Sequence, residues 1–437
     1  MVRNHAVLVL VALLNQSPPN CILKKNKLRN LWNQLGPGLI TGSSDDDPSG
    51  ITTYSQAGAK FGLNMLWTAL FSWPLMAAIQ HMCAKIGLVT KLGLAGNIKK
   101  HYPKPVIWII LLFCIPAILL NIGANISAMS GVMLLLFPKM NPFLFSISIV
   151  ISIYLIMVRF SYHKMTSLLK YVCLILFVYA IIPFIIHADF KRIATSTFFP
   201  TFTNSKEFVG MLIAIFGTTL SPYLFFWQSN MEAEETHSIK KRKFGLRRLF
   251  LNEKKDVLIG MGFSNLIMFF IILTTGTVLH QSGNTNITTL EDAALALKPL
   301  AGNEAYLLFA IGIIGTGLLS LPILTGTISY MVCETMDWNM GMNKKYKEAK
   351  SFYHLIGASL LAGLAFQILQ INPIQSLTYA AFGYGLIAPV VIVLIIQISN
   401  NKKWMGNHAN SLFINVLGCI SVAVMLSCVL FYFLFGI

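Results

Sequence analysis

Charged residues are scarce in this chain of 437 residues. Asp, Glu, Lys and Arg make up 11% of it, against roughly 25% in soluble domains, whereas 55% is hydrophobic and the mean hydropathy is +0.68. This composition argues against a soluble domain and predicts a protein of the lipid bilayer. Acids are fewer than bases, 16 against 33, which gives a net charge of +17. Because the bases lie in short runs between apolar segments, they indicate membrane topology and not nucleic-acid binding.

Motifs of catalysis and cofactor binding are also missing. The sequence has no Cys-x-x-Cys pair, no His-Glu-x-x-His, no Gly-x-Ser-x-Gly and no phosphate-binding loop, so we expect neither an enzyme nor a bound cofactor. Its seven cysteines stand singly and mostly in apolar runs, where cysteine behaves as a small core residue. No sizeable soluble domain is present to suggest a sensor or scaffold, and no obligate protein partner is evident.

Apolar runs of about 20 residues, long enough to span a bilayer, recur along the chain. They predict an all-α polytopic membrane protein in which residues 1–30 form an N-terminal extension and residues 31–437 form one transmembrane domain. We expect eleven helices, at about 34–58, 63–89, 105–137, 141–160, 168–188, 207–237, 256–280, 305–334, 351–370, 375–398 and 411–436.

Lysines and arginines in the short loops predict the orientation. When alternate loops are assigned to opposite sides, one side receives most of these residues, including the runs at 24–29, 240–248 and 344–350. We therefore expect a multi-pass protein of the cell (inner) membrane. Its N-terminus and the N-terminal extension would lie in the cytoplasm, and its C-terminus would lie outside. The loop at 288–297 opens with threonines followed by acids and an apolar stripe, which predicts a short interfacial helix.

The first predicted span carries three aspartates, Asp45, Asp46 and Asp47, followed by Pro48 and Gly50. A charged side chain at the bilayer centre costs at least about 2.5–3.5 kcal/mol, and a proline removes a backbone donor and clashes with the preceding turn. We therefore expect the helix to break here. The freed carbonyl and carboxylate oxygens then need a partner, which a cation in a protein-lined cavity would supply.

The sixth predicted span repeats this design, since Thr218 and Ser221 lead into Pro222 and Tyr223. Two proline-interrupted spans, five helices apart, are the pattern of an inverted-repeat secondary transporter with its site at the membrane midplane. The repeats would cover about 34–188 and 207–398, with 411–436 as an additional helix. A simple kink at the proline is the alternative.

Carboxylates repel anions and bind hard cations through oxygen, so a divalent cation is the expected substrate. Asp45 and Asp46 can also act only as a source of negative potential in a water-filled vestibule. Glu232 admits two interpretations, a solvated helix end paired with nearby lysines or an inner vestibule for a hydrated cation. The candidate residues for the transported cation are Asp45, Asp46, Asp47, Gly50, Thr218, Ser221, Tyr223, Gln228 and Glu232.

Two asparagines on the third predicted helix, Asn121 and Asn125, are four residues apart and share one face. We expect them to form interhelical hydrogen bonds in preference to binding the cation. Gln375, Tyr379 and Tyr384 on the tenth predicted helix are candidates to flank the site.

The segments 36–38 and 47–50, together with 221–223, resemble the Nramp divalent-metal transporters. The resemblance covers about residues 30–436. It implies the LeuT-type fold, with broken helices 1 and 6, and transport of divalent metal cations by alternating access. The metal would then be a substrate and not a cofactor.

Three positions depart from the classical pattern of that family, in which the first break reads Asp-Pro-Gly-Asn and the second has Met before its Pro and His after it. Here Gly50 stands at the Asn, Ser221 at the Met and Tyr223 at the His. A Met thioether favours softer ions such as Mn²⁺ and Fe²⁺. A roomier site of oxygen atoms alone suits Mg²⁺, which keeps several waters. The chain thus resembles the Mg²⁺-transporting branch more than the classical one.

The third predicted helix contains no Asp, Glu or His. Classical Nramps carry acids there and a His on helix 6 as a proton route, so the resemblance predicts transport without proton coupling. One alternative is a proton-coupled Mn²⁺/Fe²⁺ symporter. Another is a cation-coupled amino-acid transporter of the same fold, although three aspartates would oppose a substrate carboxylate.

Overall fold

The computed structural model describes residues 41–42, 44–160, 180–181, 185, 189–203, 205–239, 246–302, 305–368 and 372–434. They all lie within one compact unit, Pro37–Ile437. Every regular element in them is a helix, as predicted. The extension at 1–30, the start of the first predicted span and most of the predicted span at 168–188 lie outside the described residues.

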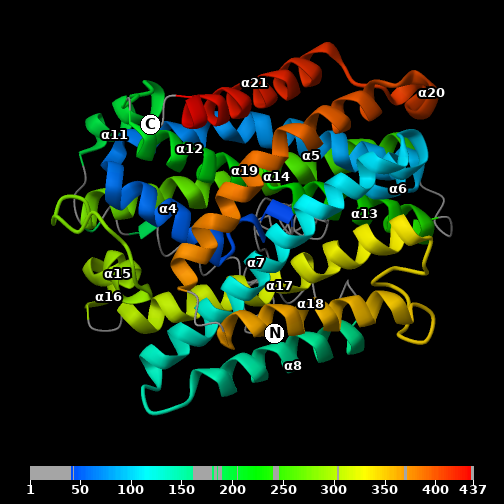
Figure 1. Ribbon diagram of the computed structural model, residues 1–437. Coiled ribbons are helices and arrows are strands. Elements are labelled where there is room, and N and C mark those ends of the chain that lie inside the picture. Colours follow the sequence, from blue (N-terminus) through cyan, green and yellow to red (C-terminus); the bar gives the residue numbers. More distant parts are fainter. Residues whose placement is uncertain are drawn as a thin grey trace, which may run out of the picture. The chain divides into compact units, whose positions relative to one another are not determined.

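The described helices follow the predicted spans closely, and most are long. Figure 1 shows their arrangement. In chain order they are α4 (Pro48–Phe61), η1 (Gly62–Met65), α5 (Trp67–Thr90), α6 (Leu94–His101), α7 (Lys104–Leu136), α8 (Pro142–Arg159), α11 (Phe190–Phe198), α12 (Lys206–Thr219), α13 (Pro222–Ile239), α14 (Leu246–Val278), α15 (Leu290–Ala294), η3 (Leu295–Leu297), α16 (Lys298–Ala301), α17 (Ala305–Met336), α18 (Lys350–Ile368), α19 (Pro373–Asn400), α20 (Lys402–Met405), η5 (Gly406–His408) and α21 (Leu412–Leu434).

Within the described residues, seven helices are long and apolar enough to cross a membrane, or up to eight if the bent pair of α4 with η1 and α5 counts as one span. The two members of that pair meet at an angle of 106°. One of the seven spans, Lys206–Thr236, combines α12 and α13 and so corresponds to the sixth predicted span. The polytopic architecture is therefore clear, while the total of eleven spans stays a prediction.

Both predicted helix breaks are present. Residues 44 and 45 are helical, Asp46 and Asp47 are not, and α4 begins at Pro48. In the second break α12 ends at Thr219 and α13 begins at Pro222. Each proline takes the first position of a helix, where its fixed φ fits and its missing N–H costs nothing.

The contacts between helices follow a reciprocal pattern. The helix α4 of the predicted first repeat packs against α14 of the predicted second, and α13 of the predicted second repeat packs against α5 of the predicted first. The long helices α7 and α17 lie side by side, with α18 packed against both, and α21 lies against α19 (Figure 1). An inverted repeat requires such an exchange of equivalent contacts.

Glycines allow the close approach in both of these reciprocal pairs. A Cβ atom on Gly58 of α4 would lie 2.5 Å from the carbonyl oxygen of Ile272 in α14. One on Gly87 of α5 would overlap the carbonyl oxygen of Ser229 in α13. Neither oxygen belongs to a side chain that can turn away, so the helices would have to separate.

The segment at 288–297 is helical from Leu290, as predicted, and its start is closed by a reciprocal cap. Asp292 N donates to Thr289 Oγ1 at 3.1 Å, and Asp292 Oδ2 accepts from the backbone N–H groups of Thr288 and Thr289 at 3.1 and 3.0 Å. Burial raises the pKa of Asp292, but the hydrogen bonds from both threonines outweigh burial and hold this pKa below its usual value.

Replacement of Gly87 by Ala should destabilise the fold by about 1–3 kcal/mol, because overpacking forces α5 away from α13. The measurement is the thermal unfolding midpoint in detergent. Gly312→Ala is the matched control, because a Cβ there would meet nothing within 4 Å. Equal midpoints for the two variants would contradict the close-contact role of Gly87.

Candidate cation site

Three aspartates lie buried where the first span breaks. The exposed fractions of Asp45, Asp46 and Asp47 are 0%, 0% and 1%. Their position follows from the local sequence, because Pro48 starts a new helix and leaves the preceding residues to turn toward the bundle interior. The negative charge predicted from the sequence is therefore inside the helix bundle and not at its surface.

Asp47 is the most fully hydrogen-bonded of the three. Its side chain caps α4, with Oδ1 accepting from the Gly50 N–H at 2.9 Å. Its Oδ2 accepts from Asn121 Nδ2 at 3.1 Å and from Asn125 Nδ2 at 3.3 Å. The carboxylate thus stands at the favourable N-terminal end of a helix and joins α4 to α7. The predicted interhelical bonds of both asparagines are confirmed, and their partner is the site itself.

Asp45 and Asp46 share one donor. Ser264 Oγ of α14 lies 2.9 Å from Asp45 Oδ2 and 3.4 Å from Asp46 Oδ1. A hydroxyl has one proton, so it satisfies one of these oxygens at a time. Asp45 Oδ1 and Asp46 Oδ2 are buried without a hydrogen-bond partner. Buried carboxylates require compensation by charge or hydrogen bonds, and here acceptors outnumber donors.

The ion pairs of Lys60 with Glu207, His81 with Glu253 and Lys99 with Asp337, all within the described residues, leave these aspartates without a cationic partner. In the same part of the chain, no three His, Cys, Asp or Glu side chains converge as a group that could hold a metal ion.

The second break presents hydroxyl and carbonyl oxygens. Ser221 Oγ donates to the Gly217 carbonyl oxygen at 2.9 Å and also contacts that of Thr218. Tyr223 OH donates to the Ser44 carbonyl oxygen at 3.2 Å, which ties α13 to the first half of the broken span. Thr218, Ser221 and Tyr223 are all buried. Oxygen atoms at the break between α12 and α13 therefore lie beside the break that precedes α4. The Tyr223 hydroxyl is hydrogen-bonded to the backbone there.

The expectation of open room at Gly50 needs correction. A Cβ atom there would lie 2.6 Å from the Asp45 carbonyl oxygen and 3.3 Å from Tyr54 Cε2. The space left by the small residue is filled by the backbone of the preceding turn. Glycine at this position serves a close approach of two chain segments.

A polar chain leads from the first break along α13. Thr41 Oγ1 donates to Gln228 Oε1 at 2.5 Å, and Gln228 Nε2 donates to Glu232 Oε1 at 3.1 Å. Glu232 is 3% exposed, so its interpretation as a solvated helix end is wrong. All nine candidate residues are thus buried, and those of the two breaks lie near one another.

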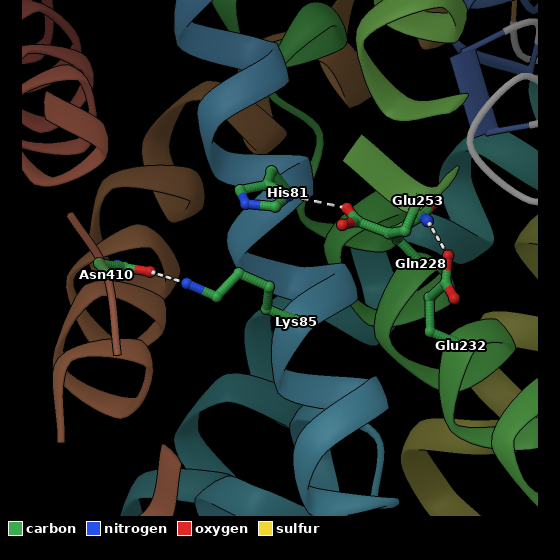
Figure 2. A network of polar contacts seen from close by, with 6 residues as sticks. All are labelled: His81, Lys85, Gln228, Glu232, Glu253 and Asn410. Atoms are coloured by element: carbon green, nitrogen blue, oxygen red, sulfur yellow. Dashed lines mark hydrogen bonds and ion pairs between the residues drawn. The ribbon is translucent and has the colours of Figure 1, made fainter. Parts of the chain in front are cut away.

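Two further polar contacts, which the sequence did not predict, lie near Gln228 and Glu232 (Figure 2). His81 Nδ1 lies 2.9 Å from Glu253 Oε1, and Lys85 Nζ donates to Asn410 Oδ1 at 3.1 Å. His81 and Lys85 extend from α5 in different directions, toward α14 and toward the chain before α21. Single ionisable residues inside the apolar α5 were the available signal, but sequence spacing could not pair residues 172 positions apart.

Of the expected flanking residues, Tyr384 is confirmed, because it is 1% exposed and its ring centroid lies 5.5 Å from that of Tyr223. Gln375 is exposed and Tyr379 is 64% exposed, so neither flanks the site.

Replacing His81 with Ala should cost about 1–3 kcal/mol of folding free energy, because the buried Glu253 carboxylate loses the hydrogen-bond partner that compensates its charge. The double variant His81→Ala/Glu253→Gln removes that charge and should recover part of the loss. Thermal unfolding of both single variants and the double variant measures the coupling. Strictly additive losses would mean that the pair contributes nothing beyond its separate residues.

Comparison with known proteins shows that nearly the whole chain matches one protein family. The family model described as natural resistance-associated macrophage protein-like (Nramp) matches residues 38–435. The divalent metal cation transporter MntH of Klebsiella pneumoniae is 22% identical over 400 residues, covering 90% of this chain and 92% of that protein.

Solved structures share the fold. A manganese transporter from Eremococcus coleocola superimposes with a TM-score of 0.75 at 17% identity, covering 92% of this chain and 86% of that one. The inward-facing conformation of Mhp1 superimposes with a TM-score of 0.55 at 10% identity, covering 90% of each chain. The fold is therefore the LeuT type, as the sequence predicted.

Proposed function

The chain belongs to the Nramp family and is a multi-pass transporter of divalent metal cations, and we propose that its preferred substrate is a hard cation such as Mg²⁺, moved by alternating access without proton coupling. The observation that carries this proposal is the buried set of three aspartates at the first break, two of which keep a carboxylate oxygen without a partner.

Asp47 is the proposed direct ligand, because it stands between the broken helix and α7 and is fixed by three N–H donors. Oxygens of Thr218 and Ser221 and the backbone around Gly50 would complete the site, and Asp45 and Asp46 would supply negative charge or further ligands. In this proposal Tyr223 shapes the site through its bond to Ser44. Gln228 and Glu232 would line the path of the cation along α13.

The preference for a hard cation rests on the donor atoms. Ser221 supplies a hydroxyl at the position where classical relatives have a thioether, and oxygen donors suit hard ions such as Mg²⁺ more than softer ones. The names of the relatives favour manganese as a second candidate substrate, since the solved structure cited above is of a manganese transporter. A proton-coupled Mn²⁺ symporter is therefore the alternative to test.

The lack of proton coupling is proposed from helix α7, which presents the amides of Asn121 and Asn125 to Asp47 and has no acid of its own. Tyr223, at the position of the family histidine, has its hydroxyl bonded to backbone. The proposed placement is an inner membrane, with the N-terminus in the cytoplasm because of the lysine and arginine distribution.

Asp47→Ala should abolish uptake of Mg²⁺, Mn²⁺ and Ca²⁺ into proteoliposomes, since no neighbouring carboxylate has the same hydrogen-bonded position. Asp337→Ala is the matched control, because Asp337 is exposed and pairs only with Lys99. Its uptake should equal that of the wild type. Unchanged transport by Asp47→Ala would refute the assignment of the site.

A pH indicator inside the same liposomes tests coupling. With the membrane potential held negative inside, wild-type Mg²⁺ uptake should leave the lumenal pH unchanged. Acidification that requires the protein and scales with cation uptake would instead support the proton-coupled alternative.

A further inference from the structure

A carboxylate near the end of α13 is held by α17 and by the turn that follows α17. Glu234 Oε1 accepts hydrogen bonds from Tyr330 OH at 2.6 Å and from the Met342 N–H at 3.0 Å. Its Oε2 accepts from Asn343 Nδ2 at 3.0 Å. A Cβ atom on Gly341, whose φ is +132°, would lie 2.5 Å from Glu234 Oε1. The turn therefore closes around this carboxylate at a position that requires glycine.

A second carboxylate, on α17, is bound by the start of α6. Glu334 Oε1 accepts from the Gly93 N–H at 2.6 Å, and Oε2 accepts from the Gly96 N–H at 2.9 Å. A carboxylate in this position satisfies N–H groups that lack a partner within the helix and interacts favourably with the helix dipole. Because α6 leads into α7, which packs against α17 and α18, these bonds lie within one group of helices. We call α6, α7, α17 and α18 the α7 group.

The Glu234 contacts, in contrast, join two groups of helices. α13 packs mainly against α5, whereas α17 packs mainly against α7. At the ends of α13 and α17 the packing is interrupted by a cavity of about 420 Å³, whose lining includes Glu234, Glu334, Lys91 and Lys344. Helix ends that are joined by a few hydrogen bonds beside a cavity lose little apolar contact when they part.

The same helix carries part of the proposed cation path. Gln228 and Glu232 precede Glu234 on α13, and both are buried. The cavity lies at the end of the molecule that Lys91 and Lys344 assign to the cytoplasm. For a cation to leave along α13 toward the cytoplasm, this end of α13 must therefore move away from the α7 group.

Resting on the alternating-access transport proposed above, we propose that Glu234 and the turn at 341–343 form a latch. The latch keeps the cytoplasmic end of α13 closed against the α7 group, and its release opens the cation path to the cytoplasm. Glu334 holds α6 to α17 in both states, so that the α7 group moves as a unit. Glu234 is in this account a gating residue that acts through the turn and not a ligand of the cation.

Labelling of a cysteine at position 233 tests the latch without any measurement of transport. Ala233 lines the same cavity and is 6% exposed, so Ala233→Cys in detergent should react slowly with a bulky, water-soluble maleimide. Glu234→Gln removes the charge and replaces one acceptor oxygen with an NH₂ group, which faces another donor in either orientation. Because a hydrogen bond to a charged group changes an equilibrium constant about tenfold or more, adding Glu234→Gln should raise the labelling rate about tenfold.

Glu348→Gln in the same Ala233→Cys background is the matched control. Glu348 accepts from the Lys345 N–H at 3.0 Å, a bond that stays within the segment after α17, so this control should label as slowly as Ala233→Cys alone. Glu234→Gln without the added cysteine should label no faster than the wild type, whose Cys83 and Cys333 are buried. Equal rates with Glu234→Gln and Glu348→Gln, or a rise that does not need the added cysteine, would overturn the latch.

Cross-linking tests whether transport requires release of the latch. In Glu234→Cys/Asn343→Cys a short bifunctional thiosulfonate should join the two sides and abolish divalent-cation uptake into proteoliposomes, and reduction should restore it. The two single variants, treated in the same way, control for native cysteines. Uptake that continues unchanged in the cross-linked protein would overturn the latch as a gate. Wild-type liposomes that take up no divalent cation would instead refute the transport on which the latch rests, while the labelling rates would stand, so the two failures are distinguishable.

Discussion

The burial of one carboxylate, Asp47, at the start of a helix is the constraint on which the centre of this molecule depends. Taking a charge out of water is expensive, and it is tolerated where hydrogen-bond donors and a helix terminus replace the lost hydration. Here Pro48 starts α4, the helix terminus and Gly50 supply part of that compensation, and α7 supplies the rest. Asp45 and Asp46 receive less, with one shared hydroxyl from α14. In the proposed function, this remaining deficit would give the site its affinity for a cation.

The same contacts connect the site to the parts of the fold that an alternating-access cycle must move. Thr41 bonds to Gln228, and Tyr223 bonds to the Ser44 carbonyl, so the first half of the broken span is held to α13 at two points. If these segments separate, both bonds must break, while Asp47 stays attached to α7 through its amides. In the proposed function, occupancy of the site and the position of the first half-helix would therefore be energetically linked. The His81–Glu253 pair adds a further bond between α5 and α14.

Much of this arrangement follows from the sequence, and the rest does not for identifiable reasons. The two helix breaks could be predicted because Pro48 and Pro222 disturb only the helical turn that precedes each of them. The capping threonine at Thr289 is equally local. Long-range pairings such as Asn121 with Asp47 or His81 with Glu253 depend on how the repeats pack, which spacing alone does not encode. The small size of Gly50 led to a wrong prediction of open space in the site, since backbone atoms fill that space. The exposure of Tyr379 depends on which face of α19 meets α12 and α4, and periodicity did not resolve it.

Anomalous X-ray diffraction from crystals grown with Mn²⁺ tests the central claim most directly, because it locates the cation without any assumption about transport. We expect one anomalous peak in contact with Asp47, between the C-terminal end of α12 and the N-terminal end of α4, that weakens when excess Mg²⁺ competes for the same position. A peak that lies away from Asp47, or one at Asp47 that excess Mg²⁺ leaves unchanged, would contradict the assignment of this site to a hard divalent cation.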